Sequence, residues 1–230
     1  MALLTIQPDG TDGLDAPIVN GPYAAINYAS QTFMFLGSFF VLDVTTYHRG
    51  VLSFDISAAA VSPAISSATL SVYSDGSGDT PGTSTFTAKR LTRTNWTEAG
   101  VTWNRYDGTN NWTTAGGDAT STNQATAEAV GNATVVTFDV TAMLRDAIAA
   151  GLTRLHVLLS GPEADGASNY YAGFTSETST AAERPKLEIA TVEAPDEGWT
   201  AAKRYAHWEA NERASPNWTA PRRYVHWEAK

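Results

Sequence analysis

Residues 46–57 read TYHRGVLSFDIS, and this stretch decides the fold class. Within it the apolar residues Leu52, Phe54 and Ile56 alternate with polar ones, so they point to one side of an extended chain. Alternation over a short run, bounded by turn-forming residues, is the signal of a β-strand with one buried face. We therefore expect a half-buried strand here.

The same alternation recurs in four later segments. A sequence with many strands that each bury one face predicts two packed sheets. One short helix is expected, with Thr141 as its N-cap and Gly151 at its end. The fold is thus predicted to be all-β, a jelly-roll β-sandwich with one short helix. The alternating positions are Ala68, Leu70 and Val72; Val136, Phe138 and Val140; Leu155, Val157 and Leu159; and Leu187 and Ile189.

Charge divides the chain into two predicted regions. The 230 residues carry a net charge of −9 and no Cys, which excludes disulfides and thiolate metal sites. Residues 193–230 hold six basic and six acidic residues, so the whole negative charge belongs to residues 1–192. We predict one β domain over 1–192 and a short C-terminal tail over 193–230, built as a hairpin or an extended arm.

Composition also excludes several partners. An acidic surface disfavours nucleic acid, because phosphate binding needs basic residues. No stretch approaches the roughly 20 apolar residues of a membrane span. The N-terminal MALLTIQPDG lacks a basic segment and a long apolar run, so no signal peptide is expected.

Five segments together resemble a known family. They are TYHRGVLSFDIS (46–57), SSATLSVY (66–73), NWTEAGVTWNRYDGTNNW (95–112), FDVTAML (138–144) and ERPKLEI (183–189). In their order and spacing they look like the DNRLRE domain, a β-sandwich related to carbohydrate-binding modules, over roughly residues 4–191. The resemblance implies a jelly-roll fold and a non-catalytic role, with polysaccharide binding in some relatives.

Aromatic residues of the 95–112 segment are candidates for sugar stacking, because a ring face can bind the apolar side of a pyranose. For Trp96 and Trp103, packing between the sheets is the favoured interpretation. Trp112 follows a polar run, so its exposure stays open, and Tyr106 joins it as a glycan-binding candidate.

Tyr170 and Tyr171 are adjacent on an expected strand, so one should face the core and the other should face outward. Both are candidate glycan ligands, with the outward one favoured. His48 and His156 stand alone within strand patterns, and we interpret them as polar side chains with satisfied hydrogen bonds.

The segment QPDGTDGLDAP contains Asp9, Asp12 and Asp15 in a glycine-rich loop. Calcium takes several oxygen ligands from loops of this kind, so these residues are a candidate structural calcium site. The spacing is not that of an EF-hand, and acidic turns without metal are common. Glu98 and Glu177 could join the site only if the fold brings them close.

No catalytic residues are predicted. Neither G-x-S-x-G nor H-E-x-x-H occurs in the sequence. Glycan hydrolysis would need two facing carboxylates at a defined separation, which an acidic sequence alone does not identify. We expect a protein that is not an enzyme and that has no cofactor apart from the candidate calcium.

The tail contains a duplicated motif. WTAAKRYAHWEA (199–210) and WTAPRRYVHWEA (218–229) match at nine of twelve positions. The tail either folds back as a hairpin or offers two docking hooks, and docking is favoured because two equal motifs suit two equal partner sites. The expected docking residues are Trp199, Arg204, Tyr205, His207, Trp208, Trp218, Arg223, Tyr224, His226 and Trp227.

These patterns lead to three functional hypotheses. The leading one is a virion accessory protein of a tailed phage, such as a decoration, head-fibre or tail-associated subunit. Its body would bind surface glycans at the virion surface, its tail would dock on other virion proteins, and it could form a homo-oligomer. The alternative is an extracellular carbohydrate-binding module of a secreted or cell-surface assembly. The third hypothesis is a glycan hydrolase.

Overall fold

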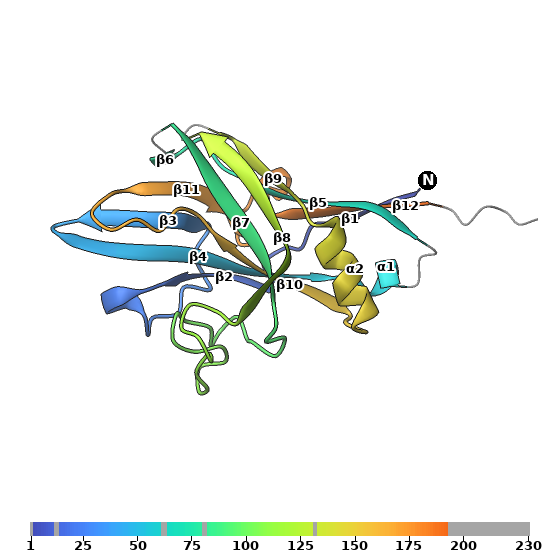
Figure 1. The fold of residues 1–230 in the computed structure, drawn as a ribbon, viewed down its shortest axis with the longest axis horizontal. Helices are drawn as coiled ribbons and strands as arrows, with labels where there is room; N and C mark the ends of the chain where they lie inside the picture. Colours follow the sequence, from blue (N-terminus) through green and yellow to red (C-terminus); the bar gives the residue numbers. More distant parts are fainter. Residues whose placement is uncertain (1, 12–13, 61–63, 80–81, 131–132, 193–230) are drawn as a thin grey trace, which may run out of the picture. The chain divides into compact units, whose positions relative to one another are not determined.

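The structure is a computed structural model that describes residues 2–11, 14–60, 64–79, 82–130 and 133–192. It is all-β, with short helices (Figure 1). The strands are β1 (Ala2–Ile6), β2 (Leu14–Val19), β3 (Phe33–Val41), β4 (Val44–Asp55), β5 (Ile65–Tyr73), β6 (Gly78–Asp79), β7 (Thr83–Leu91), β8 (Ala119–Val130), β9 (Val135–Asp139), β10 (Arg154–Ser160), β11 (Asn169–Phe174) and β12 (Lys186–Thr191).

The strands form two sheets, and neighbouring strands within each sheet are antiparallel in the described residues. A four-stranded sheet has the order β1-β12-β5-β9. An eight-stranded sheet has the order β6-β11-β3-β4-β10-β7-β8, with β2 added on β4. One hydrophobic cluster takes side chains from both sheets, the arrangement of a β-sandwich. The jelly-roll connectivity stays a prediction.

The alternation read from the sequence is confirmed by this core. Leu52, Phe54 and Ile56 are buried in the cluster, and so are all the alternating positions of the four later segments. Burial of a large aliphatic or aromatic side chain contributes about 1.5–3 kcal/mol, so this cluster is the main source of stability. Among the described residues, no helix is long and apolar enough to cross a bilayer.

The helices differ in detail from the prediction. The expected helix is α2 (Thr141–Ala149), and Gly151 follows it with φ +72°. Thr141 is the first residue of the helix, so Val140 and not Thr141 is the N-cap. The Thr141 hydroxyl accepts a hydrogen bond from the Ala68 amide at 2.8 Å. A second helix, α1 (Ser57–Ala60), and the 3-10 turns η1 (Gly21–Tyr23) and η2 (Ala181–Glu183) were not predicted.

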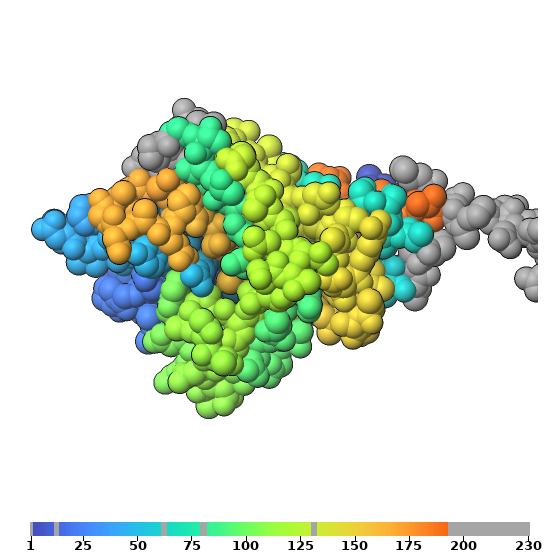
Figure 2. All heavy atoms as spheres, in the orientation of Figure 1, coloured from blue at the N-terminus to red at the C-terminus, as the bar shows by residue number. Residues whose placement is uncertain are grey.

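Strand β4 shares one edge between two partners. Its first half pairs with β3, and its second half pairs with β2. Strand β10 occupies the other edge over Arg49–Asp55. The β3–β4 hairpin therefore extends beyond the rest of the sheet, as Figures 1 and 2 show at the blue end of the body.

A second hydrophobic cluster lies on the outer face of the large sheet. It contains Val51 and Leu158, whose strand neighbours Leu52 and Leu159 face the core between the sheets. The loop of residues 92–118 covers this face and forms the green lobe in Figure 2.

This cluster corrects one expectation for the tryptophans. Trp96 and Trp103 are buried as predicted, but they belong to the 92–118 loop and pack on the outer face of the large sheet, not between the sheets. Alternation along a strand shows that two faces differ, whereas it does not show that a loop will bury the second face.

Candidate functional site

The β3–β4 hairpin carries an apolar groove, which we call the hairpin groove. It has a volume of about 420 Å³ and takes its walls from η1, β3 and β4. Tyr23 from η1 is 45% exposed at its rim. The lining residues are Pro22, Tyr23, Phe35, Phe39, Val41, Leu42, Val44, Thr46 and His48.

Stacked aromatic rings border this groove. Tyr170 of β11 stacks on Phe39 with ring centroids 3.8 Å apart and an angle of 19° between the planes. The ring of Phe35 meets both of them edge-on, at 5.6 Å from Tyr170 and 4.9 Å from Phe39. Such pairs hold each other rigidly, so they form a preorganised platform.

A glycine makes room for this stack. Tyr170 pairs directly with Gly37, which lies between Phe35 and Phe39 on β3. Gly37 has φ +130°, and a Cβ atom there would lie 2.0 Å from the carbonyl oxygen of Asn169. Only glycine permits both this backbone conformation and the close approach of β11.

The hairpin turn leaves apolar side chains in solvent. Leu42 and Asp43 have φ values of 51° and 63°, and they connect the paired residues Val41 and Val44. Positive φ at both central residues is the geometry of a type I′ turn, which usually takes Asn and Gly. Leu42 is 92% exposed despite its apolar side chain. Strained backbone and exposed apolar surface together are typical of binding sites.

The groove carries hydrogen-bonding groups without charge. Thr46 Oγ1 and His48 Nε2 are 3.0 Å apart. Burial lowers the pKa of His48 to about 4, so its imidazole is neutral at neutral pH. The lining residues include no other titratable group except Tyr23.

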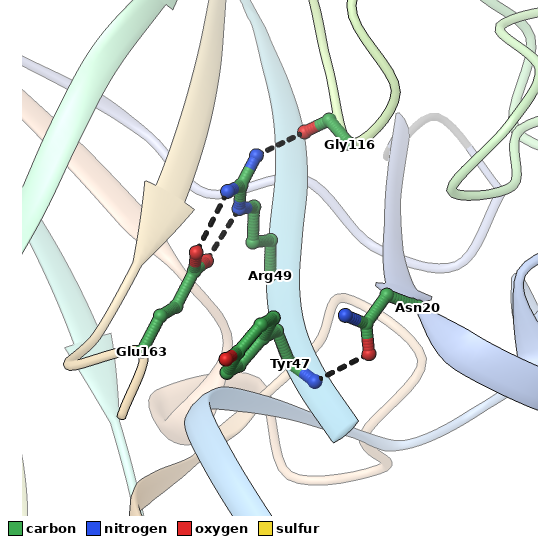
Figure 3. Close-up of polar contacts among 5 residues, drawn as sticks. All are labelled: Asn20, Tyr47, Arg49, Gly116 and Glu163. Carbon is green, nitrogen blue, oxygen red and sulfur yellow. Dashed lines mark hydrogen bonds and ion pairs between the residues drawn. The ribbon is translucent and has the colours of Figure 1, made fainter. Parts of the chain in front are cut away.

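The opposite face of β4 fixes the hairpin in place (Figure 3). Arg49 binds Glu163 through Nε and Nη2, at 2.6 Å and 2.9 Å, and its Nη1 donates to the Gly116 carbonyl at 2.9 Å. The Tyr47 amide donates to Asn20 Oδ1 at 2.6 Å. These contacts tie three separate segments to β4, so the groove is built on a rigid strand.

Comparison of the sequence with models of protein families identifies the family of this chain. Residues 11–191 match the model of carbohydrate-binding module family 96. The chain belongs to this family. The match indicates carbohydrate binding and supports the carbohydrate-binding-module part of the resemblance, whereas the DNRLRE name stays a prediction. A comparison with curated proteins finds no match.

Of the four predicted glycan residues, Tyr170 alone lies next to the groove of this family 96 module, where it stacks on the lining residue Phe39. Tyr170 is half-buried against Phe39, and Tyr171 is buried in the core, which confirms that one faces out and one faces in. Trp112 is only 5% exposed, and Tyr106 is buried beside it. Their rings stabilise the 92–118 loop and present no open face to solvent.

The groove residues of β3 have a signal in the sequence that did not enter the predictions above. Residues 32–41 read TFMFLGSFFV, with apolar side chains at both odd and even positions. Met34 and Leu36 fill the core, so Phe35 and Phe39 are left for the other face. A strand with two apolar faces predicts a second covered or functional surface.

A polar hollow in the 92–118 loop is another surface near the predicted residues. It has a volume of about 390 Å³, and its lining includes Trp112, which is almost fully buried. A third hollow, of about 560 Å³, lies beside it and is lined by polar and small side chains such as Arg93 and Asp118. Of these three surfaces in the described residues, the hairpin groove is the one lined by several aromatic rings. The polar hollow is lined by Ala25, Asn104, Arg105, Asn111, Trp112, Thr113 and Ala115.

The candidate calcium residues have separate environments. Asp15 is buried, and Glu98 and Glu177 lie close enough to raise the pKa of its carboxyl. Asp9 Oδ1 accepts a hydrogen bond from the Thr11 amide at 2.8 Å, and Asp12 lies outside the described residues. The tail residues predicted to dock, from Trp199 to Trp227, also lie outside the described residues.

Proposed function

We propose that this chain is a non-catalytic module that binds polysaccharide in the hairpin groove. The observation that carries the proposal is the stack of Tyr170 on Phe39 beside the exposed ring of Tyr23. Pyranose rings have apolar C–H faces that pack on aromatic rings, so this platform suits a sugar chain.

The chemistry of the groove suits uncharged sugar rings. Thr46 offers a hydroxyl and His48 a neutral imidazole, which can exchange hydrogen bonds with sugar hydroxyls. None of the described residues that line the groove is a carboxylate, lysine or arginine. Binding is therefore expected to depend on stacking and to respond weakly to salt.

The test is affinity electrophoresis of the full chain in gels that contain a β-glucan, a xylan, a mannan or polygalacturonate. We expect at least one of these to retard the wild-type chain. Tyr23→Ala and Tyr170→Ala should each weaken that binding by about fivefold or more, as loss of a stacked ring costs about 1 kcal/mol or more.

Tyr73→Ala is the matched control, because Tyr73 is a half-buried tyrosine on β5 of the other sheet. It should bind like the wild type. Equal binding by all three variants, or weaker binding only after Asn111→Ala in the polar hollow, would remove the hairpin groove as the site. A wild-type chain that no polysaccharide retards contradicts the proposed function itself.

The setting of the module is a further part of the proposal. The duplicated tail favours attachment to a larger assembly, either a virion or a secreted or cell-surface complex. Many copies in purified particles support the virion role, whereas protein in particle-free supernatant supports the other setting. Incubation of the protein with the polysaccharide that it binds should release no reducing ends. Release of reducing ends would support the hydrolase hypothesis instead.

A further inference from the structure

The hairpin groove and the polar hollow meet at one segment of the chain. Pro22 and Tyr23 line the groove, and Ala25 lines the hollow. Two residues of chain span at most about 7 Å, so these walls of the two surfaces lie close together. The segment of residues 20–28 therefore separates the two surfaces, and we call it the η1 ridge.

Hydrogen bonds hold the η1 ridge on both sides. The Asn20 amide donates to the Tyr47 carbonyl at 3.1 Å, and Asn20 Oδ1 accepts from the Tyr47 amide, which ties the ridge to β4 (Figure 3). Asn27 Nδ2 donates to the Val101 carbonyl at 2.7 Å, which ties the ridge to the 92–118 loop. The ridge thus has a fixed position between the groove and the hollow.

The backbone continues from the ridge across the 92–118 loop. The Asn104 amide donates to the Ala24 carbonyl at 3.1 Å, and the Trp112 amide donates to the Asn104 carbonyl at 3.1 Å. Arg105 and Asn111 form an antiparallel bridge beside these bonds. Chain segments that are joined in this way lie about 4.8 Å apart. The ridge and the two loop segments are therefore neighbours, as Figure 2 shows where the blue segment after β2 meets the green lobe.

The polar hollow presents groups that suit sugar hydroxyls. Asn104, Asn111 and Thr113 line it, and all three are exposed. An amide side chain can donate and accept, and so can a hydroxyl, so each can bond a hydroxyl group of a sugar. The ring of Trp112 supports this surface from below, where its Nε1 donates to the Thr102 carbonyl at 2.9 Å.

The top of the η1 ridge is apolar and low. Tyr23 is 45% exposed and Ile26 is 46% exposed, so the ridge offers apolar contact to the C–H faces of sugar rings. Ala24 and Ala25 carry only methyl groups, so no long side chain at these two positions stands between the surfaces.

We propose that one polysaccharide chain runs from the hairpin groove over the η1 ridge into the polar hollow. The groove stacks one part of the chain, and Asn104 and Asn111 bond the hydroxyl groups of the sugar units that follow. This inference rests on the proposed function and adds the class of substrate to it: the module binds the interior of a long polysaccharide chain and has lower affinity for short oligosaccharides.

The test is an NMR titration of the 15N-labelled full chain with a disaccharide and a hexasaccharide of the polysaccharide that retards the chain most strongly. The disaccharide should shift the groove amides of Thr46 and His48. The hexasaccharide should also shift the amides of Ala25, Asn104 and Asn111. It should bind about twentyfold or more tightly than the disaccharide, because it makes the added hydrogen bonds.

A hexasaccharide also contains several disaccharide units, which raises its affinity a few-fold without a second contact, so variants are needed. The double variant Asn104→Ala/Asn111→Ala should lose about tenfold in affinity for the hexasaccharide and nothing for the disaccharide. Ala25→Arg places a long side chain on the ridge and should have the same effect. Gln124→Ala is the matched control, because it removes an exposed amide side chain on β8 and should bind both ligands like the wild type.

Wild-type affinity for the hexasaccharide in both the double variant and Ala25→Arg overturns this path for the chain. In that case, weaker binding of both ligands by Tyr170→Ala still supports the hairpin groove as the sugar site. A wild-type chain that binds neither ligand contradicts the proposed function, and this inference fails with it.

Discussion

Trp96 Nε1 donates a hydrogen bond to Nδ1 of His156 at 3.0 Å, and both side chains are buried. This bond joins the 92–118 loop to β10 on the outer face of the large sheet. The imidazole can accept it only when Nδ1 carries no proton. The loop is therefore anchored through a neutral histidine.

This contact predicts a loss of stability in mild acid. Burial, and then the charge of Arg154, lowers the pKa of His156 from 6.5 to about 4. Between these values the unfolded chain binds a proton that the native chain does not, so stability falls as pH drops from about 6.5 to 4. The contribution of His156 is at most about 3 kcal/mol.

Urea unfolding of the wild type and His156→Gln at pH 7.0 and 4.5 measures this effect. Gln does not titrate, so the stability advantage of the wild type should shrink by about 1–3 kcal/mol at the lower pH. An advantage of the same size at both pH values contradicts the assignment. Other titrating groups, including His48, affect both proteins equally.

Arg49→Lys should loosen the 92–118 loop. Arg49 makes a two-point ion pair with Glu163, bonds the Gly116 carbonyl and lies 4.6 Å from the Trp103 ring centre. Lysine keeps the charge and loses the fork and the stacking, so we expect a cost of about 1–3 kcal/mol. Amide exchange at Gly116, whose N–H bonds the Trp103 carbonyl, should become faster.

Arg145→Lys is the comparison, because Arg145 is also an arginine that bonds backbone oxygens, but on α2. It should leave exchange in the 92–118 loop unchanged. If the Gly116 amide of Arg49→Lys exchanges at the wild-type rate, the contacts of Arg49 do not hold the loop.

Gly37→Ala should separate β11 from β3. The new methyl group would meet the Asn169 carbonyl, and φ +130° is unfavourable for alanine. We expect a loss of about 3 kcal/mol or more, together with loss of the Tyr170–Phe39 stack. Gly166→Ala is the control, because its φ is +73° but nothing lies within 4 Å, so it should cost only about 1 kcal/mol. Equal costs for the two variants would contradict the argument from close approach.

Deletion of residues 195–230 should leave a folded β domain. Residues 1–193 form a compact unit, and the described residues of this unit supply both hydrophobic clusters, so the truncated chain is expected to keep its core. Calorimetry should show one cooperative transition close to that of the full chain, while attachment to the native assembly is lost. Aggregation or loss of the transition would show that the tail belongs to the core, against the docking hypothesis.

The sequence was informative where one local rule decides the structure. Alternation identified the buried positions of β4, β5, β9, β10 and β12, because each strand faces a core on one side. Gly151 after α2 followed from its freedom to adopt positive φ. The solitary histidines were correctly expected to have partners, since buried polar groups rarely lack them.

The candidate site depends on contacts that no local pattern contains. Tyr170 reaches Phe39 only because β11 pairs with β3 across Gly37, about 130 residues away in the chain. Trp112 lies in a polar run yet is buried, because the 92–118 loop folds on the sheet. Glu98 and Glu177 lie near Asp15 through the same kind of long-range folding. From the sequence, their nearness could be named only as a condition for a calcium site.

The most direct test of carbohydrate binding in the hairpin groove is an NMR titration of the 15N-labelled chain. The ligand is a short oligosaccharide from the polysaccharide that retards the chain most strongly. We predict amide shift changes concentrated at Phe39, Thr46, His48 and Tyr170, with Asn111 and Arg105 unchanged. Changes confined to Asn111, Arg105 and their neighbours in the polar hollow would contradict the account and move the sugar site to the 92–118 loop.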